Sequence, residues 1–295
     1  MANRQTFNFL VNFMPAIKAT AIILNYHKAR QTVENVRSLN AQNNPYLWKI
    51  IVIDNSCDPS EAEVLKPLNQ QENLVLLVNQ KNIGYARAHR LVCPVIAGDY
   101  VLIANPDIVW RDPAALDKMI AYLDNHPDIG ILGPKQINTD GQTAMTIRAW
   151  PKFILQVARR TRLRNWPVFR DRVAYDEMRH LDYGQIQDVD WLQSSCQLIR
   201  RAVWEAAGGF SCAYFLFMSD VEICYQAWAR GYRVVYYPLA MVGADGRRAS
   251  AGGFRAFFRN RALRRHVVDS LYYRLKHFWR GDPRQRYYRL REPNK

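Results

Sequence analysis

An apolar run that ends abruptly in polar residues reads Tyr100-Val101-Leu102-Ile103-Ala104-Asn105-Pro106-Asp107. Its first five residues are typical of a buried strand in a parallel sheet. Pro106 has no N–H to give to a sheet ladder, so the strand must end there. Asn105 and Asp107 are therefore predicted at the carboxyl end of a central strand, where open α/β sheets bind ligands. Their side-chain oxygens suit a hard cation such as Mg²⁺ or Mn²⁺, and the alternative is a simple turn.

Strand-like and helix-like segments alternate on both sides of this run. Apolar runs at residues 19–24, 48–53, 74–78 and 232–238 predict further strands, and residues 30–43 carry apolar side chains at helical spacing. This alternation predicts an α/β fold with a right-handed, mostly parallel central sheet that helices cover on both faces. The chain lacks both the dinucleotide-binding glycine fingerprint and the P-loop motif, which disfavours a hydride-transfer enzyme or a P-loop ATPase.

The net charge of +15 over 295 residues is concentrated in two windows. Residues 152–172 hold seven Lys and Arg against one acid, and residues 255–295 hold thirteen against three. Such windows predict an anionic partner, which could be nucleic acid, an acidic membrane surface or a phosphorylated substrate. Five cysteines without a Cys-x-x-Cys pair predict a reducing compartment and neither a disulfide framework nor a zinc site. No apolar run is long enough to span a membrane, and residues 1–18 are expected to be a loosely held leader.

Eight short motifs in a fixed order make the chain similar to glycosyltransferase family 2, which has the GT-A fold. Within that family the chain most resembles the bacterial rhamnosyltransferase branch. The resemblance implies a GT-A domain over residues 19–250, with a nucleotide-sugar half at 19–107 and an acceptor half at 108–250. The motifs are Asp54-Asn55-Ser56, Asn82-Ile83-Gly84-Tyr85, Asn105-Pro106-Asp107, Gly133-Pro134-Lys135, Val189-Asp190-Trp191, Arg200-Arg201 leading to Gly208-Gly209-Phe210, Asp220-Val221-Glu222-Ile223-Cys224, and Gly231-Tyr232-Arg233-Val234.

The resemblance assigns binding of a nucleotide-sugar donor to residues at the ends of the predicted strands. Asn25 and Asp54 would meet the base and ribose, although Asp54 also fits a simple Asx-turn. Asn82 and Gly84 would shape the donor pocket, although Gly84 also fits a helix entry without a ligand. Three further candidates for substrate binding are Lys135, Arg148 and Trp191.

A divalent metal, Mg²⁺ or Mn²⁺, is implied by the same resemblance. Asp107 stands where the family keeps its Asp-x-Asp motif and would ligate the metal, while the neutral Asn105 would assist through water or the sugar. The family usually places a histidine after the last strand, and this chain has none there. Asp245 could replace it as a ligand, or Arg247 and Arg248 could grip the diphosphate as fixed cations. The two arginines also fit a solvated loop.

Asp220 stands where the family keeps its general base. In an inverting transfer, one carboxylate takes the proton from the acceptor hydroxyl as that oxygen attacks the anomeric carbon. The transition state resembles an oxocarbenium ion, and the metal neutralises the leaving diphosphate. Asp220 also fits as a helix N-terminal residue favoured by the helix dipole, and Glu222 is expected to support the site or face solvent. Ser219 replaces the acid that the family usually has before the base.

Residues 251–295 are expected to form a basic, membrane-associating helical extension. From residue 254 to 280, aromatic and aliphatic side chains interleave with arginines, as in amphipathic helices that lie in a membrane interface facing anionic head groups. The alternative is ordinary helices packed on the core. The resemblance implies a cytoplasmic enzyme, peripheral on the inner face of the cytoplasmic membrane. It would move L-rhamnose from dTDP-L-rhamnose to a saccharide on a polyprenyl diphosphate lipid.

Three classes of function stay open from the sequence. The first is this inverting glycosyltransferase, with rhamnose or with another hexose or N-acetylhexosamine carried by UDP or GDP. The second is a nucleic-acid-binding protein, but the chain shows no helix-turn-helix, zinc-finger or RNA-recognition signature, so no nucleic-acid partner is expected. The third is a catalytically idle relative that binds sugars or scaffolds an assembly, as the missing histidine and Ser219 would suit.

Overall fold

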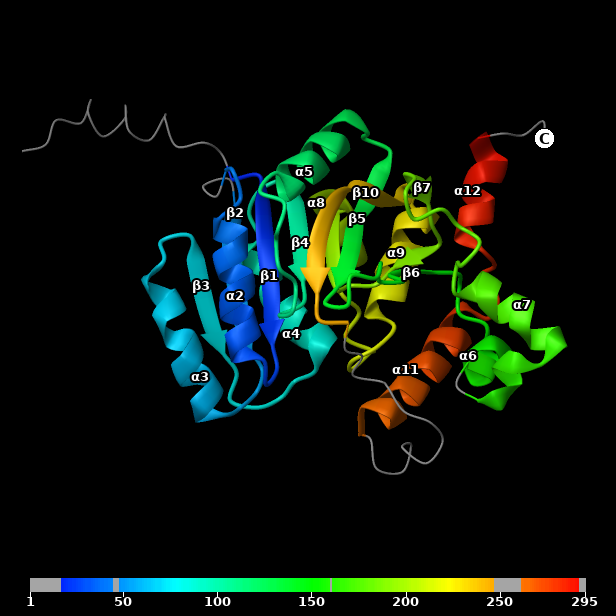
Figure 1. Cartoon of the computed structure of the whole chain (residues 1–295), viewed down its shortest axis with the longest axis horizontal. Helices are drawn as coiled ribbons and strands as arrows, with labels where there is room; N and C mark the ends of the chain where they lie inside the picture. Colours follow the sequence, from blue (N-terminus) through cyan, green and yellow to red (C-terminus); the bar gives the residue numbers. More distant parts are fainter. Residues whose placement is uncertain (1–16, 45–47, 160, 247–260, 292–295) are drawn as a thin grey trace, which may run out of the picture.

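The structure is a computed structural model that describes residues 17–44, 48–159, 161–246 and 261–291. In this part of the chain, one eight-stranded sheet has the order β3-β2-β1-β4-β9-β5-β10-β7, and β6 and β8 form a small second sheet (Figure 1). The strands are β1 (Ala19–Asn25), β2 (Trp48–Asp54), β3 (Leu74–Val78), β4 (Tyr100–Ala104), β5 (Ile129–Asn138), β6 (Ile147–Arg148), β7 (Gln187–Asp188), β8 (Trp191–Leu192), β9 (Cys196–Arg200) and β10 (Arg233–Ala244). The α-helices are α2 (Ala29–Asn40), α3 (Pro59–Leu65), α4 (Tyr85–Leu91), α5 (Ala115–Asn125), α6 (Phe153–Arg159), α7 (Pro167–Asp176), α8 (Arg201–Ala207), α9 (Ser219–Ala229), α11 (Arg261–His277) and α12 (Pro283–Arg291). Short 3-10 helices are η2 (Lys66–Gln70), η3 (Cys93–Val95) and η4 (Arg162–Asn165).

The sheet is mostly parallel, which confirms the predicted α/β fold class. β1 pairs in parallel with β2 and β4, β2 with β3, and β5 with β10. β9 runs antiparallel between β4 and β5, and β7 pairs antiparallel with β10. All residues of β1 and β4 are buried, as their continuous apolar sequences predict for strands covered on both faces.

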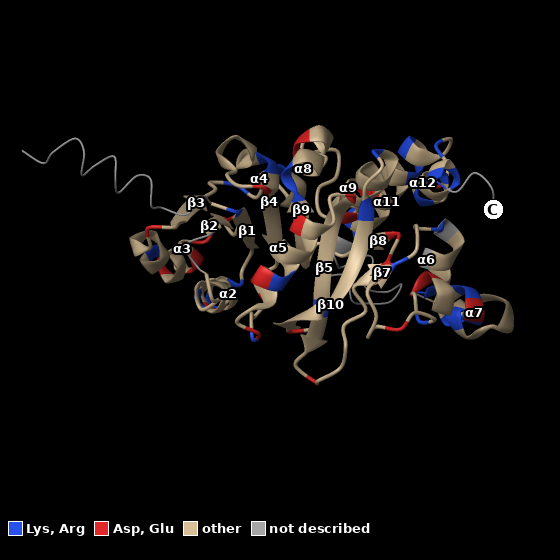
Figure 2. Ribbon diagram, turned by 90° about the horizontal axis from the view of Figure 1, so that it is seen from above, with Lys and Arg blue, Asp and Glu red and all other residues tan. Residues whose placement is uncertain are grey.

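Two hydrophobic layers cover the two faces of the sheet. Successive residues of β4 alternate between them: Leu102 packs with the residues of α2 and α5, and Val101 and Ile103 pack with those of α4, α8 and α9. Figure 2 shows α4 and α8 on one side of the strands and α2 on the other. This sandwich leaves the carboxyl ends of the parallel strands as the edge at which polar side chains can gather.

The last strand is longer than the sequence predicted. Pro238 was expected to end it, but β10 continues to Ala244. The register between β10 and β5 shifts between Tyr237 and Met241, so a β-bulge lets the strand pass the proline.

Both C-terminal helices pack back onto the domain. The rings of Trp228 on α9 and Tyr287 on α12 have centroids 5.2 Å apart, and Arg284 Nη1 donates to Asp190 Oδ1 at 2.7 Å. Within the described residues, no helix has both the length and the apolar character that a membrane span requires. Residues 1–16 of the expected leader, and residues 251–260 and 292–295 of the expected extension, lie outside the described part.

Candidate active site

The end of β4 and the start of β9 bring two predicted site residues to one edge of the sheet. Ala104 of β4 pairs with Cys196 of β9. Directly beyond this pair, Asn105 N donates to Ser195 O at 2.8 Å. The neighbouring Ser194 N then donates to Asp220 Oδ2 at 3.4 Å. The loop that follows β4, which carries Asp107, and the start of α9, which carries Asp220, are therefore tied to the same short connection.

Asp220 lies in the first turn of α9 with an unusually basic carboxylate. Its Oδ1 accepts a hydrogen bond from Val221 N at 2.9 Å. Burial raises the pKa of Asp220 to about 6, since the loss of hydration outweighs the backbone hydrogen bonds that favour the charged form. At neutral pH this group is ionised but is a stronger base than an exposed aspartate, which is what a general base requires.

Asp107 and Asp245 face each other across a short antiparallel bridge. Val109 N donates to Gly243 O at 3.0 Å, and Gly243 N donates to Val109 O at 2.8 Å. In an antiparallel pair, a step of two residues back along one segment matches a step of two residues forward along the other. Because Val109 pairs with Gly243, Asp107 lies opposite Asp245. The fold therefore brings together the two acids that the sequence analysis named as candidate metal ligands, and their role as ligands stays a prediction.

A lysine that the sequence analysis did not single out lies between the two acids. Lys28 Nζ is 3.3 Å from Asp107 Oδ1 and 3.2 Å from Asp245 Oδ2. Burial raises the pKa of Asp107, the charge of Lys28 opposes this shift, and the neighbouring Asp245 adds to it. Two neighbouring carboxylates repel each other, and in this structure the ammonium of Lys28 offsets part of that repulsion.

The same pair of acids fits a hard divalent cation. Mg²⁺ and Mn²⁺ prefer carboxylate oxygens and commonly complete their shell with water and substrate phosphate oxygens. In the described ranges, no cluster of three or more His, Cys, Asp or Glu could hold a metal, so Asp107 and Asp245 would be joined by such ligands. Arg247 and Arg248 lie outside the described residues, and their predicted grip on a diphosphate stays a prediction.

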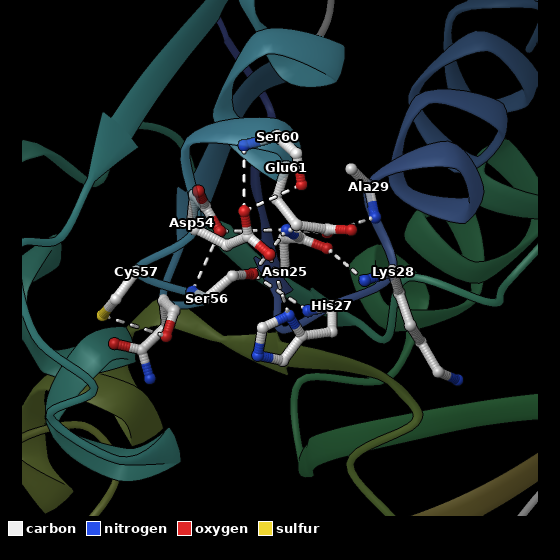
Figure 3. A network of polar contacts seen from close by, with 11 residues as sticks. Asn25, His27, Lys28, Ala29, Asp54, Ser56, Cys57, Ser60 and Glu61 are labelled. Atoms are coloured by element: carbon white, nitrogen blue, oxygen red, sulfur yellow. Dashed lines mark hydrogen bonds and ion pairs between the residues drawn. The ribbon is translucent and has the colours of Figure 1, made fainter.

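Asn25 is the centre of a buried polar network (Figure 3). The network adjoins Asp107 and Asp245 through Lys28, which contacts both. Asn25 Nδ2 lies within hydrogen-bond distance of Asp54 Oδ1, Ser56 Oγ and Glu61 Oε2, at 2.9, 3.0 and 3.0 Å. Its Oδ1 accepts from Lys28 N at 3.1 Å. Asn25 therefore fastens together the loops after β1 and β2, and Glu61 is a member of the site that the sequence analysis missed.

Asp54 retains one unused acceptor in this network. Its Oδ1 accepts from Ser56 N at 3.0 Å as well as from Asn25, which confirms the Asx-turn reading. Its Oδ2 is buried and has no hydrogen-bond partner in the described structure. A buried carboxylate oxygen without a partner is costly, so it is a candidate to accept a hydrogen bond from a ligand.

Asn82 and Gly84 shape the loop between β3 and α4. Asn82 Oδ1 accepts from Asn55 Nδ2 at 2.8 Å and from Gly84 N at 2.9 Å. Gly84 has a φ of 87°, and a Cβ placed on it would lie 2.7 Å from Phe215 O. Only glycine fits there, and Tyr85 N donates to the same Phe215 O at 2.7 Å. This loop therefore touches the segment that leads to Asp220.

Of the three remaining candidates, one lies on the main sheet and two lie on the small sheet formed by β6 and β8. Lys135 is half-buried on β5 and lies opposite Met241 of β10. Arg148 is buried, donates from Nη1 to Ile147 O at 2.6 Å, and its charge lowers the pKa of Asp176, which burial raises overall. Trp191 Nε1 donates to Ala149 O at 2.8 Å, and its ring packs on the hydrophobic cluster beneath α9. These contacts support the protein itself, and contact with substrate stays a prediction for all three.

Of the two readings of Glu222, that it supports the site or that it faces solvent, the second is wrong. It is buried on α9 and accepts from Tyr214 OH at 2.8 Å and from Lys276 Nζ at 2.9 Å, with His277 Nε2 2.7 Å away. Burial raises its pKa, but hydrogen bonds from His277, Lys276 and Gln226 outweigh that effect and hold the pKa at about 2. Glu222 is therefore a charged anchor for α11.

The chain is similar in sequence to proteins of known name. Over 181 residues the chain is 32% identical to the N-acetylglucosaminyl-diphospho-decaprenol L-rhamnosyltransferase of Mycobacterium tuberculosis, a match covering 58% of each protein. It is 24% identical over 204 residues to the O-antigen biosynthesis protein RfbC of Myxococcus xanthus, which covers 68% of this chain and 15% of that protein. The chain thus spans 58% of the length of the mycobacterial relative.

Solved structures show the same fold at low identity. The mannosyltransferase PcManGT of Pyrobaculum calidifontis, solved with GDP-Man and Mn²⁺, superposes with a TM-score of 0.58 at 17% identity, covering 92% of this chain and 68% of that one. GalNAc-T7, solved with UDP, GalNAc and Mn²⁺, gives a TM-score of 0.55 at 15% identity, covering 83% and 47%. These likenesses confirm the predicted GT-A architecture. The family model described as "Glycosyltransferase like family 2" matches residues 15–265, and the chain therefore belongs to that family.

Proposed function

We propose that the protein is an inverting, metal-assisted glycosyltransferase. It moves L-rhamnose from dTDP-L-rhamnose to a saccharide carried on a polyprenyl diphosphate lipid. The reaction serves the synthesis of a bacterial surface polysaccharide such as O-antigen, capsule or cell wall. The observation that carries the proposal is the placement of Asp220, with a pKa raised to about 6, on the same sheet edge as the facing acids Asp107 and Asp245. The sugar and the lipid acceptor are inferred from the name of the mycobacterial relative.

Each polar group at the edge has a distinct task in this reaction. Asp220 takes the proton of the acceptor hydroxyl as its oxygen attacks the anomeric carbon, with inversion. Asp107 and Asp245 would hold Mg²⁺ or Mn²⁺, which neutralises the charge that develops on the leaving diphosphate. The ammonium of Lys28, already within 3.3 Å of both acids, adds positive charge on the same side.

The donor base would dock on the network around Asn25. The unpartnered Oδ2 of Asp54 is an acceptor for a base N–H, such as the imino group of thymine. Asn82 and Gly84 fix the backbone of the loop that borders this network, since Asn82 Oδ1 bonds both Asn55 and Gly84. This arrangement favours a nucleotide whose base carries an N–H hydrogen-bond donor on its Watson–Crick edge.

A donor screen tests the nucleotide, the sugar and the metal together. We expect dTDP-L-rhamnose to raise the melting temperature more than UDP- or GDP-linked sugars do, and only when Mn²⁺ or Mg²⁺ is present. Asp54→Asn should remove the shift, because it replaces the unpartnered acceptor with a donor, whereas Asp99→Asn, an exposed acid far from the site, should keep it. Product formation with a lipid-linked acceptor, followed by mass spectrometry, then separates an enzyme from a sugar-binding relative. A chain that no sugar nucleotide stabilises would contradict the proposal.

The acceptor would be presented at an anionic membrane surface. The outer face of α11 exposes a row of apolar side chains, and it continues past the helix end; the most exposed members are Val268, Leu271, Leu275, Phe278 and Trp279. Figure 2 shows Lys and Arg gathered at this end of the molecule, on α7, α11 and α12. An exposed apolar stripe flanked by arginines suits the interface of a membrane with anionic head groups. Part of the basic charge is paired within the protein, because Arg159 Nη1 lies 2.9 Å from the carboxylate of Asp176.

Charging the apolar stripe should release the protein from membranes. We expect the double variant Leu271→Glu, Leu275→Glu to bind vesicles containing phosphatidylglycerol about 10- to 100-fold more weakly, because each leucine loses burial in the interface and each glutamate repels the lipid. Co-sedimentation with vesicles measures this. Val64→Glu is the control, since Val64 is 40% exposed on α3, at the opposite end of the molecule (Figure 1). Unchanged sedimentation of the double variant, or wild-type retention on duplex DNA without vesicle binding, would overturn the membrane assignment.

A further inference from the structure

The carboxylate of Asp269 on α11 is occupied by the backbone of another segment. Asp269 is 3% exposed. It accepts hydrogen bonds from three consecutive backbone N–H groups, those of Phe215 at 3.3 Å, Leu216 at 3.0 Å and Phe217 at 2.9 Å. A buried acid that collects three amides of one loop fixes the path of that loop, because each amide would otherwise be left without a partner.

The loop held by Asp269 leads directly into the start of α9. Met218 follows it as the N-cap of that helix with a φ of 67°, a left-handed conformation that a side-chain-bearing residue adopts only when its surroundings impose it. Two residues later comes Asp220. The direction in which the carboxylate of Asp220 leaves the helix therefore depends on where residues 215–217 are held.

The same loop also contacts the segment that carries Asn82 and Gly84, the candidate donor-binding residues. Phe215 O accepts from Tyr85 N at 2.7 Å, beside the glycine at position 84 that permits the approach. Tyr85 OH in turn donates to Ser194 Oγ at 3.1 Å, and Ser194 N donates to Asp220. Residues 215–217 are thus clamped between α11 and the loop that precedes α4.

A second tie makes α11 a rigid support. One helical face carries Asp269 toward the loop and, two turns later, Lys276 and His277 toward Glu222 of α9. Both contacts are charge-assisted and shielded from water, which strengthens them relative to exposed pairs. The C-terminal helix therefore contacts both the loop before Asp220 and the helix that carries it.

We propose that Asp269 is a positioning residue that sets the place of Asp220 by holding the backbone of residues 215–217. One face of α11 then supports the active centre, and its other face exposes apolar side chains. The inference rests on the proposed function only in its kinetic consequence, because the hold on the loop exists in the free protein. Asp269 itself lies behind the loop and needs no contact with substrate.

Hydrogen exchange tests the structural step without any substrate. In Asp269→Ala, the amides of residues 215–217 should exchange at least about tenfold faster than in the wild type, with Asp269→Asn, which keeps one acceptor oxygen, in between. Ser270→Ala is the matched control, because Ser270 is buried at the next position of α11 and its Oγ lies 3.1 Å from His266 Nδ1 of the same helix. Unchanged protection in a folded Asp269→Ala would overturn the inference, whatever the protein catalyses.

Kinetics test the consequence for the reaction. With a donor that the wild type turns over, Asp269→Ala should lower kcat about 10- to 100-fold, the size expected when a general base is displaced, while KM for the donor changes less than about threefold. Asp269→Asn should recover part of kcat, and Ser270→Ala should leave it unchanged. Normal kcat in the folded alanine variant, or equal loss of donor affinity and turnover, would refute the positioning role. A wild type that turns over no donor would instead count against the proposed function.

Discussion

Asp220→Asn should abolish sugar transfer while leaving donor binding intact. The amide keeps the shape of the side chain and can still accept from Val221 N, whose bond to Asp220 Oδ1 is 2.9 Å long, but it cannot take a proton from the acceptor hydroxyl. Loss of a general base costs about 10²- to 10⁴-fold in kcat. Product formation measures the loss, and calorimetric titration with the donor measures binding, which we expect to depend on residues after β1, β2 and β4.

The pH dependence of the wild type gives the same prediction a second readout. Because the pKa of Asp220 is raised to about 6, the ionised base is lost below that pH, and kcat should fall about tenfold per pH unit on the acid side. A folded-state pKa above the ordinary value of 3.8 means that this group favours folding at low pH and loses that contribution as the pH rises through about 6. The asparagine variant should therefore be at least as stable as the wild type at pH 7, so unfolding cannot explain its inactivity.

The matched control for Asp220→Asn is Glu205→Gln, which removes an exposed carboxylate that lies 3.4 Å from Arg201 of the same helix and should leave kcat and its pH profile unchanged. Turnover of Asp220→Asn at the wild-type rate, or an acid limb that persists in it near pH 6, would remove Asp220 from the role of base.

Most of the fold was predictable because it follows from local sequence. The apolar runs at β1, β2, β3 and β4 identify strands, and their alternation with helices predicts that these strands run parallel. Since the parallel strands share one carboxyl edge, Asn25 and Asp54 had to meet, and they pair in register. Pro106 marked the end of β4 and with it the place of Asp107. The strand end at Pro238 failed because a bulge, which depends on the neighbouring strand, has no local signal.

The parts of the site that escaped prediction depend on contacts between distant segments. Lys28 follows β1 without any motif, and it meets Asp107 and Asp245 only because a bridge joins Val109 to Gly243. Glu222 looks like an exposed acid at the start of a helix, and it is buried only because α11 returns to cover it. The sequence of α11 predicted a helix but could not reveal that Asp269 holds the loop before Asp220, or that Lys276 and His277 contact Glu222.

Asp107→Asn should lose both the response to metal and the affinity for the donor. The substitution removes one of two facing carboxylates, and a neutral amide binds a hard cation more weakly than a charged oxygen does. We expect Mn²⁺ affinity, measured by the electron paramagnetic resonance signal of the free ion, to fall at least about 10- to 100-fold, the range seen even for residues that only support a ligand. Donor affinity measured with Mn²⁺ should fall with it, whereas donor affinity without metal should change little.

The variant Lys28→Met is a control that should change the Mn²⁺ affinity in the opposite direction. Its ammonium lies 3.3 Å from Asp107 Oδ1 and 3.2 Å from Asp245 Oδ2, so it competes with any cation that these acids bind. Removing it leaves two adjacent carboxylates without their internal counter-charge, and Mn²⁺ should then bind more tightly than in the wild type. If Asp107→Asn keeps its Mn²⁺ affinity, or if Lys28→Met loses it, the acids do not hold the metal. Lys28 would then be the cation that faces the leaving diphosphate, because its charge is fixed at this edge by the same two side chains.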